Sequence, residues 1–235
     1  MISSFYTAAT GLTELQKGFE VSANNIANIS STGYKASDAS FADLIYTNIN
    51  DPKGKATDLK SGHGVKLDKT DTQFTMGDLQ QTSRPLDYAL TTNNDFFAVQ
   101  TGGTVEYTRN GNFHLSEEQG KSYLVSSDGG YVLDPKGQKI AVTNEKDKLN
   151  VGVYTFANCD GLERAGGNSA FTATSASGAA KVVTNAEVKK EWLEGSNVNM
   201  ADEMVSVMEL QRAFQFNSKI VQFSDEISQT INGLR

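Results

Sequence analysis

Apolar residues repeat every seven positions along the first thirty residues of the chain. The repeat consists of Phe5, Leu12, Phe19 and Ile26, with Met1, Ala8, Leu15, Ser22 and Ile29 at the intervening positions. An alternation of three and four residues is the pattern of a coiled-coil seam. It predicts a helix from about Ser3 to Asn28 whose apolar side needs a partner, and the last helix of the chain is the candidate within the molecule.

Two glycines interrupt this predicted helix. Gly11 and Gly18 are seven residues apart and share a stripe of small residues beside the seam. Each glycine costs about 1 kcal/mol relative to alanine in a helix, so we expect a compensating role. A small-residue stripe lets a second helix approach closely, whereas the alternative is that both glycines are tolerated on an exposed face. Gly33 follows a cluster of helix-breaking residues and is a natural left-handed terminator.

A second long helix is predicted at the C-terminal end. Asn199 is a plausible N-cap, and Asp202 and Glu203 place negative charge in the first turn, where the helix dipole favours it. One apolar line comprises Met200, Met204, Val207, Phe214 and Val221, and a second comprises Leu210, Ala213, Ile220, Ile227, Ile231 and Leu234. An apolar stripe that migrates around a helix predicts contacts on more than one side.

The lengths of the two helices favour assembly. At 1.5 Å per residue the first helix is roughly 40 Å long and the last roughly 50 Å, too long for one small domain to cover. We therefore expect other subunits to bury part of their apolar surface. The residues predicted at subunit interfaces from these patterns are Phe5, Gly11, Leu12, Leu15, Gly18, Phe19, Ile26, Met204, Val207, Phe214, Val221, Ile227 and Ile231.

The middle of the chain carries strand signals. Asn110-Gly111 separates residues 104–109 from 112–115, and this dipeptide predicts a two-residue hairpin turn between them. Further short strands are expected at 96–99 and 151–156. The Ser, Ala, Thr and Gly-rich stretch from Gly166 to Gly178 is interpreted as a mobile loop or a weak edge. Several short strands at this spacing indicate a small antiparallel β-domain.

Periodicity weakens between the first helix and these strands. A short apolar anchor at Phe41, Leu44 and Ile45 precedes a polar loop from Asn50 to Gly64. The predicted fold class is α+β: terminal helices paired as a coiled coil, a central antiparallel all-β domain and an extended linker. The predicted divisions are an N-terminal axial helix at 1–33, a linker region at 34–71, a β-domain at 72–193 and a C-terminal axial helix at 194–235.

Composition excludes several classes of function. A net charge of −7 and a pI near 4.9 argue against nucleic-acid binding. A single cysteine, Cys159, rules out an intramolecular disulfide and is interpreted as a small buried hydrophobe. The N-terminus lacks the pattern of a cleavable secretory signal, and no apolar run is long enough to span a bilayer. We expect no membrane insertion, and either a cytosolic protein or export by a route without such a signal.

No cluster of residues indicates catalysis or metal binding. His63 lies in a Gly-His-Gly stretch and His114 on a predicted strand, and each is interpreted as structural. We expect no enzyme activity, no cofactor and no metal. The alternative from another class is a β-domain that binds or cleaves cell-wall glycan on an oligomerisation stalk. Its acidic pair would come from five carboxylates that have no diagnostic spacing: Asp87, Asp95, Glu106, Asp128 and Asp134.

Three groups of motifs resemble those of bacterial flagellar axial proteins of the rod and hook class. The first is 22–28 with 31–35, the second is 77–87 with 107–111, and the third is 194–199 with 203–204, 211–214 and 217–219. Their order and placement cover nearly the whole chain. The resemblance is closest to the basal-body rod proteins, proximal or distal, and it is less close to the hook protein.

The resemblance implies a structural role. In that family the terminal helices form the inner wall of a tube, which is both drive shaft and export channel, and the β-domain forms the outer layer. The implied partners are copies of this chain, other rod and hook subunits, and the flagellar type III export apparatus. The implied location is the basal body in the cell envelope. The alternative within the class is a hook or hook-junction subunit.

The resemblance also assigns roles to polar residues. The amides of Asn24, Asn25 and Asn28 would satisfy backbone groups at the helix end and linker. Gln211 and Arg212 would offer donors between neighbouring helices. The family-motif residues at the helix end and linker are Asn24, Asn25, Asn28, Gly33, Tyr34, Lys35, Asn197 and Asn199.

Overall fold

The chain forms two compact units. A computed structural model describes residues 3–48, 60–118, 120–142, 149–165, 169–184 and 186–234. Unit 1 comprises Met1–Ile26, Ser37–Asp71 and Asn199–Arg235, and unit 2 comprises Ala27–Ala36 and Thr72–Val198. The chain therefore crosses from one unit to the other four times, after residues 26, 36, 71 and 198.

Unit 1 contains the two terminal helices, as the apolar patterns predict. Helix α1 spans Ser3–Ala27 and α2 spans Met200–Gly233. The Asn199 side chain caps α2 by accepting a hydrogen bond from the Ala201 backbone N–H at 3.0 Å, which confirms the predicted N-cap. Neither helix is long and apolar enough over its described residues to cross a membrane.

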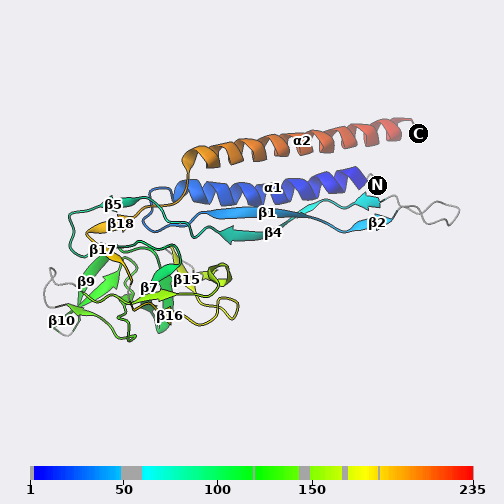
Figure 1. Ribbon diagram of the computed structural model, residues 1–235. Coiled ribbons are helices and arrows are strands. Elements are labelled where there is room, and N and C mark those ends of the chain that lie inside the picture. Colours follow the sequence, from blue (N-terminus) through cyan, green and yellow to red (C-terminus); the bar gives the residue numbers. More distant parts are fainter. Residues whose placement is uncertain are drawn as a thin grey trace. The chain divides into compact units, whose positions relative to one another are not determined.

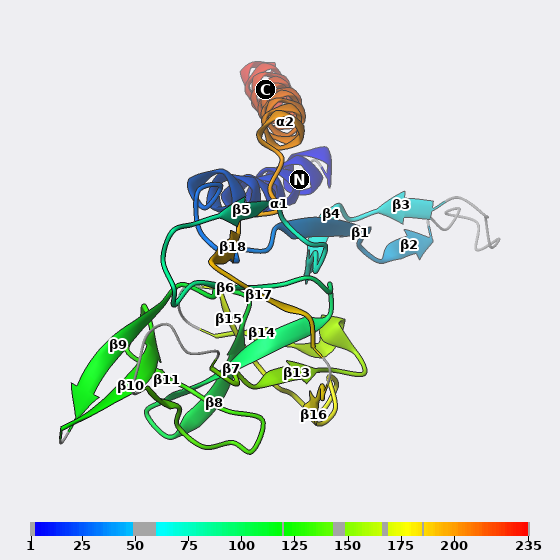
Figure 2. The same cartoon turned by 60° about the vertical axis from the view of Figure 1, so that its left-hand side comes forward.

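Strands complete unit 1 where the sequence shows only weak periodicity. β1 (Ser37–Asp43) pairs with β4 (Val65–Thr72), and β2 (Tyr46–Asn48) pairs antiparallel with β3 (Lys60–Gly62). The predicted polar loop at 50–64 lies largely outside the described residues, and Lys60–Gly62 near its end form β3. Helix α1 lies between α2 and the β1–β4 ribbon (Figures 1 and 2).

Unit 2 is the predicted antiparallel β-domain. Its main sheet has ten strands, with the central path β12-β10-β11-β7-β8-β15-β14. Two further pairs, β5 with β18 and β6 with β17, lie outside this sheet. The strands are β5 (Leu79–Gln81), β6 (Tyr88–Leu90), β7 (Asp95–Thr101), β8 (Thr104–Thr108), β9 (Phe113–Glu118), β10 (Lys121–Ser126), β11 (Tyr131–Val132), β12 (Ala141–Val142), β13 (Val153–Thr155), β14 (Glu163–Arg164), β15 (Ala170–Thr172), β16 (Lys181–Val182), β17 (Val188–Lys190) and β18 (Trp192–Glu194), with a short 3-10 helix at Cys159–Gly161.

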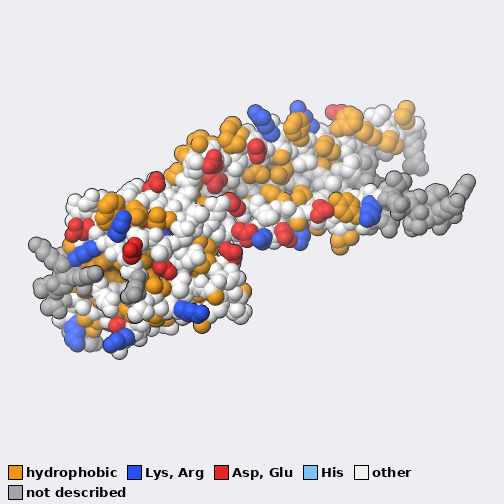
Figure 3. All heavy atoms as spheres, viewed as in Figure 1, with side chains coloured by type: hydrophobic (Ala, Val, Ile, Leu, Met, Phe, Trp, Pro, Cys, Tyr) orange, Lys and Arg blue, Asp and Glu red, His pale blue; other side chains and the backbone are white. Residues whose placement is uncertain are grey.

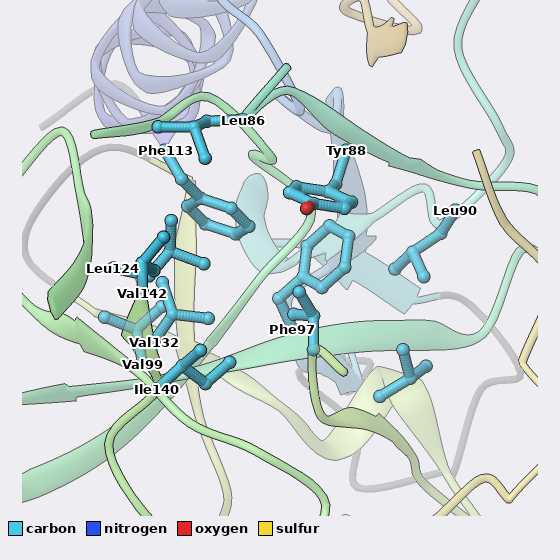
Figure 4. Close-up of a cluster of buried hydrophobic side chains, with 12 residues drawn as sticks. Leu86, Tyr88, Leu90, Phe97, Val99, Phe113, Leu124, Val132, Ile140 and Val142 are labelled. Carbon is cyan, nitrogen blue, oxygen red and sulfur yellow. The ribbon is translucent and has the colours of Figure 1, made fainter. Parts of the chain in front are cut away.

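Strand β7 organises the core of unit 2. Its successive side chains point to opposite faces, so Phe97 and Val99 enter one apolar cluster while Phe96 and Ala98 enter another. The first cluster, which also includes Phe113, is drawn in Figure 4. Both faces of β7 are covered, and its residues 96–99 form a continuous apolar run rather than an alternating pattern.

Cys159 packs against the second of these clusters as a half-buried residue, as a small hydrophobe would. Burial raises the pKa of its thiol, which lowers the fraction of reactive thiolate.

The predicted Asn110-Gly111 hairpin is wrong. β8 pairs with β7 through the Gly102-Gly103 turn, and β9 pairs with β10. The Asn110 side chain instead accepts a hydrogen bond from the Asn112 N–H, and Gly111 passes directly against the Tyr88 backbone. A Cβ on Gly111 would lie 1.6 Å from the Tyr88 carbonyl oxygen. The dipeptide marks a close crossing of two backbones rather than a turn between paired strands.

Two other glycine-rich interpretations need correction. The stretch from Gly166 to Gly178 contains β15, which is paired on both sides, and Phe171 within it is buried; residues 166–168 lie outside the described part. Gly33 does adopt a left-handed conformation, with φ of 67°, but α1 has already ended at Ala27. Its conformation instead lets its N–H donate to the Glu194 carbonyl at 2.8 Å.

Candidate functional site

The buried side of α1 is its small-residue stripe. A Cβ on Gly18 would lie 2.7 Å from Phe41 Cζ of β1 and 3.5 Å from Leu210 Cδ2 of α2. A Cβ on Gly11 would lie 3.3 Å from Asn217 Nδ2 of α2. Both glycines are buried, so they allow close approach by other elements, and the exposed-face interpretation does not hold.

Asn25 joins three elements of unit 1. Its Oδ1 accepts from the Ser37 N–H at 3.0 Å, and its Nδ2 donates to the Ser37 carbonyl at 2.8 Å and to Glu203 Oε1 at 2.6 Å. The side chain is 1% exposed. One buried amide therefore connects α1, the start of β1 and the first turn of α2. Asn28 lies beyond α1 and accepts from the Ser31 hydroxyl at 3.1 Å.

Replacing Asn25 with alanine should destabilise unit 1. The change leaves the Ser37 backbone groups and the Glu203 carboxylate without this partner, which costs about 1–3 kcal/mol in unfolding free energy. Faster hydrogen exchange at the Ser37 amide would report the loss. Asn24→Ala, at an exposed neighbouring position, is the matched control. Equal exchange at Ser37 in both variants would contradict the assignment.

The predicted coiled-coil seam is only partly buried, at Ala8 and Ser22. Phe5 and Phe19 are exposed, while Leu12, Leu15 and Ile26 are half-buried. The predicted α2 residues are likewise open to solvent: Met204, Gln211, Arg212, Phe214, Ile227 and Ile231 are exposed and Val207 and Val221 half-buried. Among the described positions of α2, Ser224 is the buried one.

Two apolar surfaces remain open on unit 1. The first is the interhelical groove, a cavity of about 240 Å³ lined by Leu15, Gln16, Phe19, Leu210, Gln211 and Phe214. The second, the outer stripe of α2, consists of the exposed residues Phe216, Ile220, Phe223, Ile227 and Leu234. Figure 3 shows orange apolar side chains gathered along this helical region.

The groove and the outer stripe lie on different flanks of α2. Phe216 and Phe223 precede Asn217 and Ser224, the residues that face α1, by one position each. One position is a rotation of about 100° around a helix. Phe214 lies on the opposite side of the line through Asn217 and Ser224, and it lines the groove. The chain therefore presents two distinct apolar surfaces, one concave and one convex.

Unit 2 contains a buried ion cluster. Glu194 Oε1 accepts from Lys35 Nζ at 2.6 Å and from the Gly77 N–H at 3.0 Å. Arg109 Nε donates to Glu194 Oε2 at 2.9 Å, and Arg109 Nη2 lies 2.8 Å from the same oxygen without hydrogen-bond alignment. The side chains of Lys35, Arg109 and Glu194 are fully buried.

Each motif group contributes one residue to this cluster. Lys35 comes from the first group, Arg109 from the second and Glu194 from the third. The sequence prediction includes Lys35 as a motif residue but misses its ionic role and the other two residues. Tyr34, also predicted, is buried, and its ring lies 5.0 Å from the Arg164 guanidinium carbon.

Asn197 holds the same region together through its amide. Its Oδ1 accepts from the Ala36 N–H at 2.7 Å, and its Nδ2 donates to the Gln73 carbonyl at 2.8 Å and to the Thr75 hydroxyl at 2.9 Å. Asn25 in unit 1 and Asn197 in unit 2 therefore both bond to backbone groups.

Three of the candidate catalytic carboxylates have other partners. Asp87 accepts from the Thr82 hydroxyl at 2.8 Å, Asp95 accepts from the Thr92 hydroxyl, and Asp134 accepts from the Lys136 and Gln138 N–H groups. The described residues contain no group of three histidines, cysteines or carboxylates able to hold a metal ion. The main features of the described residues are the two apolar surfaces of unit 1 and the buried polar contacts of both units.

Comparisons with known proteins agree with this arrangement. Three family profiles match: "Flagella basal body rod protein" at residues 5–35, "Flagellar hook protein FlgE/F/G D1 domain" at 92–154, and "Flagellar basal body rod FlgEFG protein C-terminal" at 189–234. The first covers most of α1, the second part of the main sheet, and the third β18 with α2.

Similar curated proteins extend over the whole chain. The flagellar basal-body rod protein FlgG of Bacillus subtilis is 31% identical, covering 100% of both chains. FlgG of Borreliella burgdorferi is 32% identical over 100% of this chain and 99% of the relative. The flagellar hook-basal body complex protein FlhP of Bacillus subtilis is 26% identical over 100% of both. On these matches, the chain belongs to the flagellar basal-body rod protein family and is a structural subunit of the rod.

Proposed function

We propose that this rod subunit polymerises helically with copies of itself and with other axial flagellar subunits through α1 and α2. The observation that carries the proposal is the pair of open apolar surfaces on unit 1, the interhelical groove and the outer stripe of α2. Soluble monomers rarely leave contiguous apolar surface of this kind uncovered, and such surface marks interaction sites. A second copy of the chain supplies a matching apolar helix.

Coiled-coil packing belongs to this proposal. The α1 seam residues Leu15 and Phe19 face the groove together with Leu210 and Phe214 of α2. A neighbouring helix seated there would bury the seam and complete knobs-into-holes contacts that two helices alone leave open. On this proposal the small-residue stripe of α1 serves contacts within the chain, and the seam serves contacts between chains.

The position within the flagellum is part of the same proposal. The resulting tube would act as drive shaft and export channel in the basal body, with the subunit delivered by the flagellar type III apparatus, as the family resemblance implies. Relatives of at least 30% identity are named as rod proteins, which favours the rod over the hook or hook-junction alternative. Division into residues 1–33, 34–71, 72–193 and 194–235 remains a prediction.

A charge placed in the groove should abolish assembly. Phe214→Asp puts a carboxylate among Leu15, Phe19 and Leu210, where covering it would cost several kcal/mol. We expect this variant to remain monomeric in sedimentation experiments at concentrations where the unchanged protein forms polymers. Fluorescence of Trp192, which lies in β18, should show that unit 2 is still folded.

The matched control is Gln215→Asp, which introduces the same charge at an exposed adjacent position outside the groove. It should assemble like the unchanged chain. Polymers of normal length from Phe214→Asp would contradict the role of the groove.

A further inference from the structure

Three segments of unit 2 lead directly to the points where the chain passes into unit 1. Residues 33–36 end at the passage after residue 36, residues 73–78 begin after the passage at 71, and residues 194–197 precede the passage at 198. We call them the connecting segments. They are far apart in the sequence, so their association needs specific contacts.

Backbone hydrogen bonds tie the connecting segments to one another. The Gly33 N–H donates to the Glu194 carbonyl at 2.8 Å, the Gln73 N–H to the Ala36 carbonyl at 2.8 Å, and the Gly195 N–H to the Asp78 carbonyl at 2.8 Å. Each pair of segments is therefore bonded directly. The Asn197 amide adds bonds to the other two segments.

Glu194 and Arg109 fasten this bundle to the main sheet. Arg109 follows β8, and its Nη1 donates to the carbonyl oxygens of Thr92 and, at 2.7 Å, of Asp95, the first residue of β7. Its Nε donates to Glu194, while Lys35 donates to Glu194 and, at 2.6 Å, to the Thr75 carbonyl. Glu194 thus links each connecting segment to Arg109 beside the sheet, and Arg164 of β14 adds a bond from its Nη2 to the Lys35 carbonyl at 2.8 Å.

The charges in this cluster do not balance without Glu194. Two buried cations, Lys35 and Arg109, share one buried carboxylate. Burial lowers the pKa of the Lys35 ammonium, and the charge and hydrogen bond of Glu194 act in the opposite direction. Removing the anion would leave two unpaired charges out of water, which is far more costly than losing an exposed ion pair.

We propose that the Glu194 side chain is a clamp that fastens the three connecting segments to the β-domain and makes the folding of unit 2 conditional on the C-terminal segment. The first 193 residues contain both buried cations but not their anion. The clamp also joins the connecting segments to the sheet, so that they form one cooperative body with it.

Native-state hydrogen exchange on the full chain tests the cooperative body. The amides of Gly33, Gly77 and Asn197 should exchange as slowly as those of Phe97 and Val99 in β7, through unfolding of unit 2 as a whole. Much faster exchange of the connecting segments than of β7 would overturn the proposal, since the segments would then open while the sheet stays folded.

Glu194→Gln tests the charge. We expect the unfolded fraction of unit 2, followed by urea titration, to rise roughly a hundredfold or more, because both cations lose their anion. Glu191→Gln, at an exposed position three residues before Glu194, should leave the titration unchanged. Similar midpoints for the two variants would overturn the proposal.

A rescue distinguishes a charge clamp from ordinary packing. Adding Lys35→Met to Glu194→Gln removes one of the two unpaired cations, so the double variant should be more stable than Glu194→Gln alone. A double variant that is less stable than Glu194→Gln alone, with the two losses of unfolding free energy adding, would overturn the proposal. If Glu194→Gln does not fold, Lys35→Met alone still tests the proposal. This variant keeps the balanced Arg109–Glu194 pair, so unit 2 should fold. Failure of Lys35→Met to fold would overturn the proposal.

Discussion

Gly111→Ala should destabilise unit 2 by about 3–5 kcal/mol, which is a large share of the stability of a domain of this size. A methyl group at this position would lie 1.6 Å from the Tyr88 carbonyl oxygen, 2.7 Å from its carbonyl carbon and 3.2 Å from its Cα. All three contacts are with backbone, which has no side-chain rotation to relieve them. The Tyr88 N–H also donates to the Gly111 carbonyl at 3.1 Å, so the two chains cannot separate without losing that bond.

Urea denaturation followed by Trp192 fluorescence measures this loss. The probe suits unit 2, because Trp192 is the single tryptophan and lies in β18. Gly233→Ala is the control: no heavy atom lies within 4 Å of the added Cβ, and alanine favours the helix. An unfolding midpoint for Gly111→Ala within experimental error of the Gly233→Ala midpoint would show that the backbones do not cross as described.

Gly111 also illustrates which parts of the fold can be predicted from the sequence and which cannot. Local patterns identify both helices, the Asn199 cap and the antiparallel β-domain, because caps and periodicity act within a few residues. The Asn110-Gly111 dipeptide also carries a local signal, but here the glycine is required by Tyr88, more than twenty residues away. A contact between segments distant in sequence leaves no mark in the spacing of nearby residues.

The apolar surface of α1 is likewise predicted only in part from the sequence. The heptad repeat correctly locates an apolar line on α1, but of that line the structure buries the small residues Ala8 and Ser22, together with the adjacent Gly11, Gly18 and Asn25. Small residues carry little hydrophobic signal, and their importance follows from how closely Phe41 and Leu210 approach them. Hydropathy alone therefore does not separate the small residues that pack within the chain from the large seam residues Phe5 and Phe19, which stay exposed.

The ion cluster is harder still to foresee. Lys, Arg and Glu are ordinarily exposed, so composition gives no reason to bury Lys35, Arg109 and Glu194. The available signal is that each of the three motif groups contains one of these charges. That signal suggests a shared site but gives no distances, which only the fold of unit 2 supplies.

Mixing two assembly-defective variants should produce dimers and no polymers of greater length. The groove variant Phe214→Asp keeps its outer stripe, and the stripe variant Phe216→Asp/Phe223→Asp keeps its groove. Each alone should remain monomeric, because burying even a single aspartate in an apolar contact costs several kcal/mol. Gln215→Asp/Gln222→Asp carries the same two charges, seven residues apart at exposed positions of α2, and is the matched control for the double variant.

The pairing follows from the kind of interface that two different surfaces make. A convex stripe of one copy seated in the concave groove of the next is a heterologous contact, which repeats without closing and so builds an open helical polymer. In the mixture the intact stripe of the groove variant meets the intact groove of the stripe variant, and both remaining surfaces are blocked. Sedimentation velocity should therefore show dimers in the mixture alone. Dimers from either variant by itself would indicate a symmetric contact of like surfaces, and monomers in the mixture would show that stripe and groove do not meet.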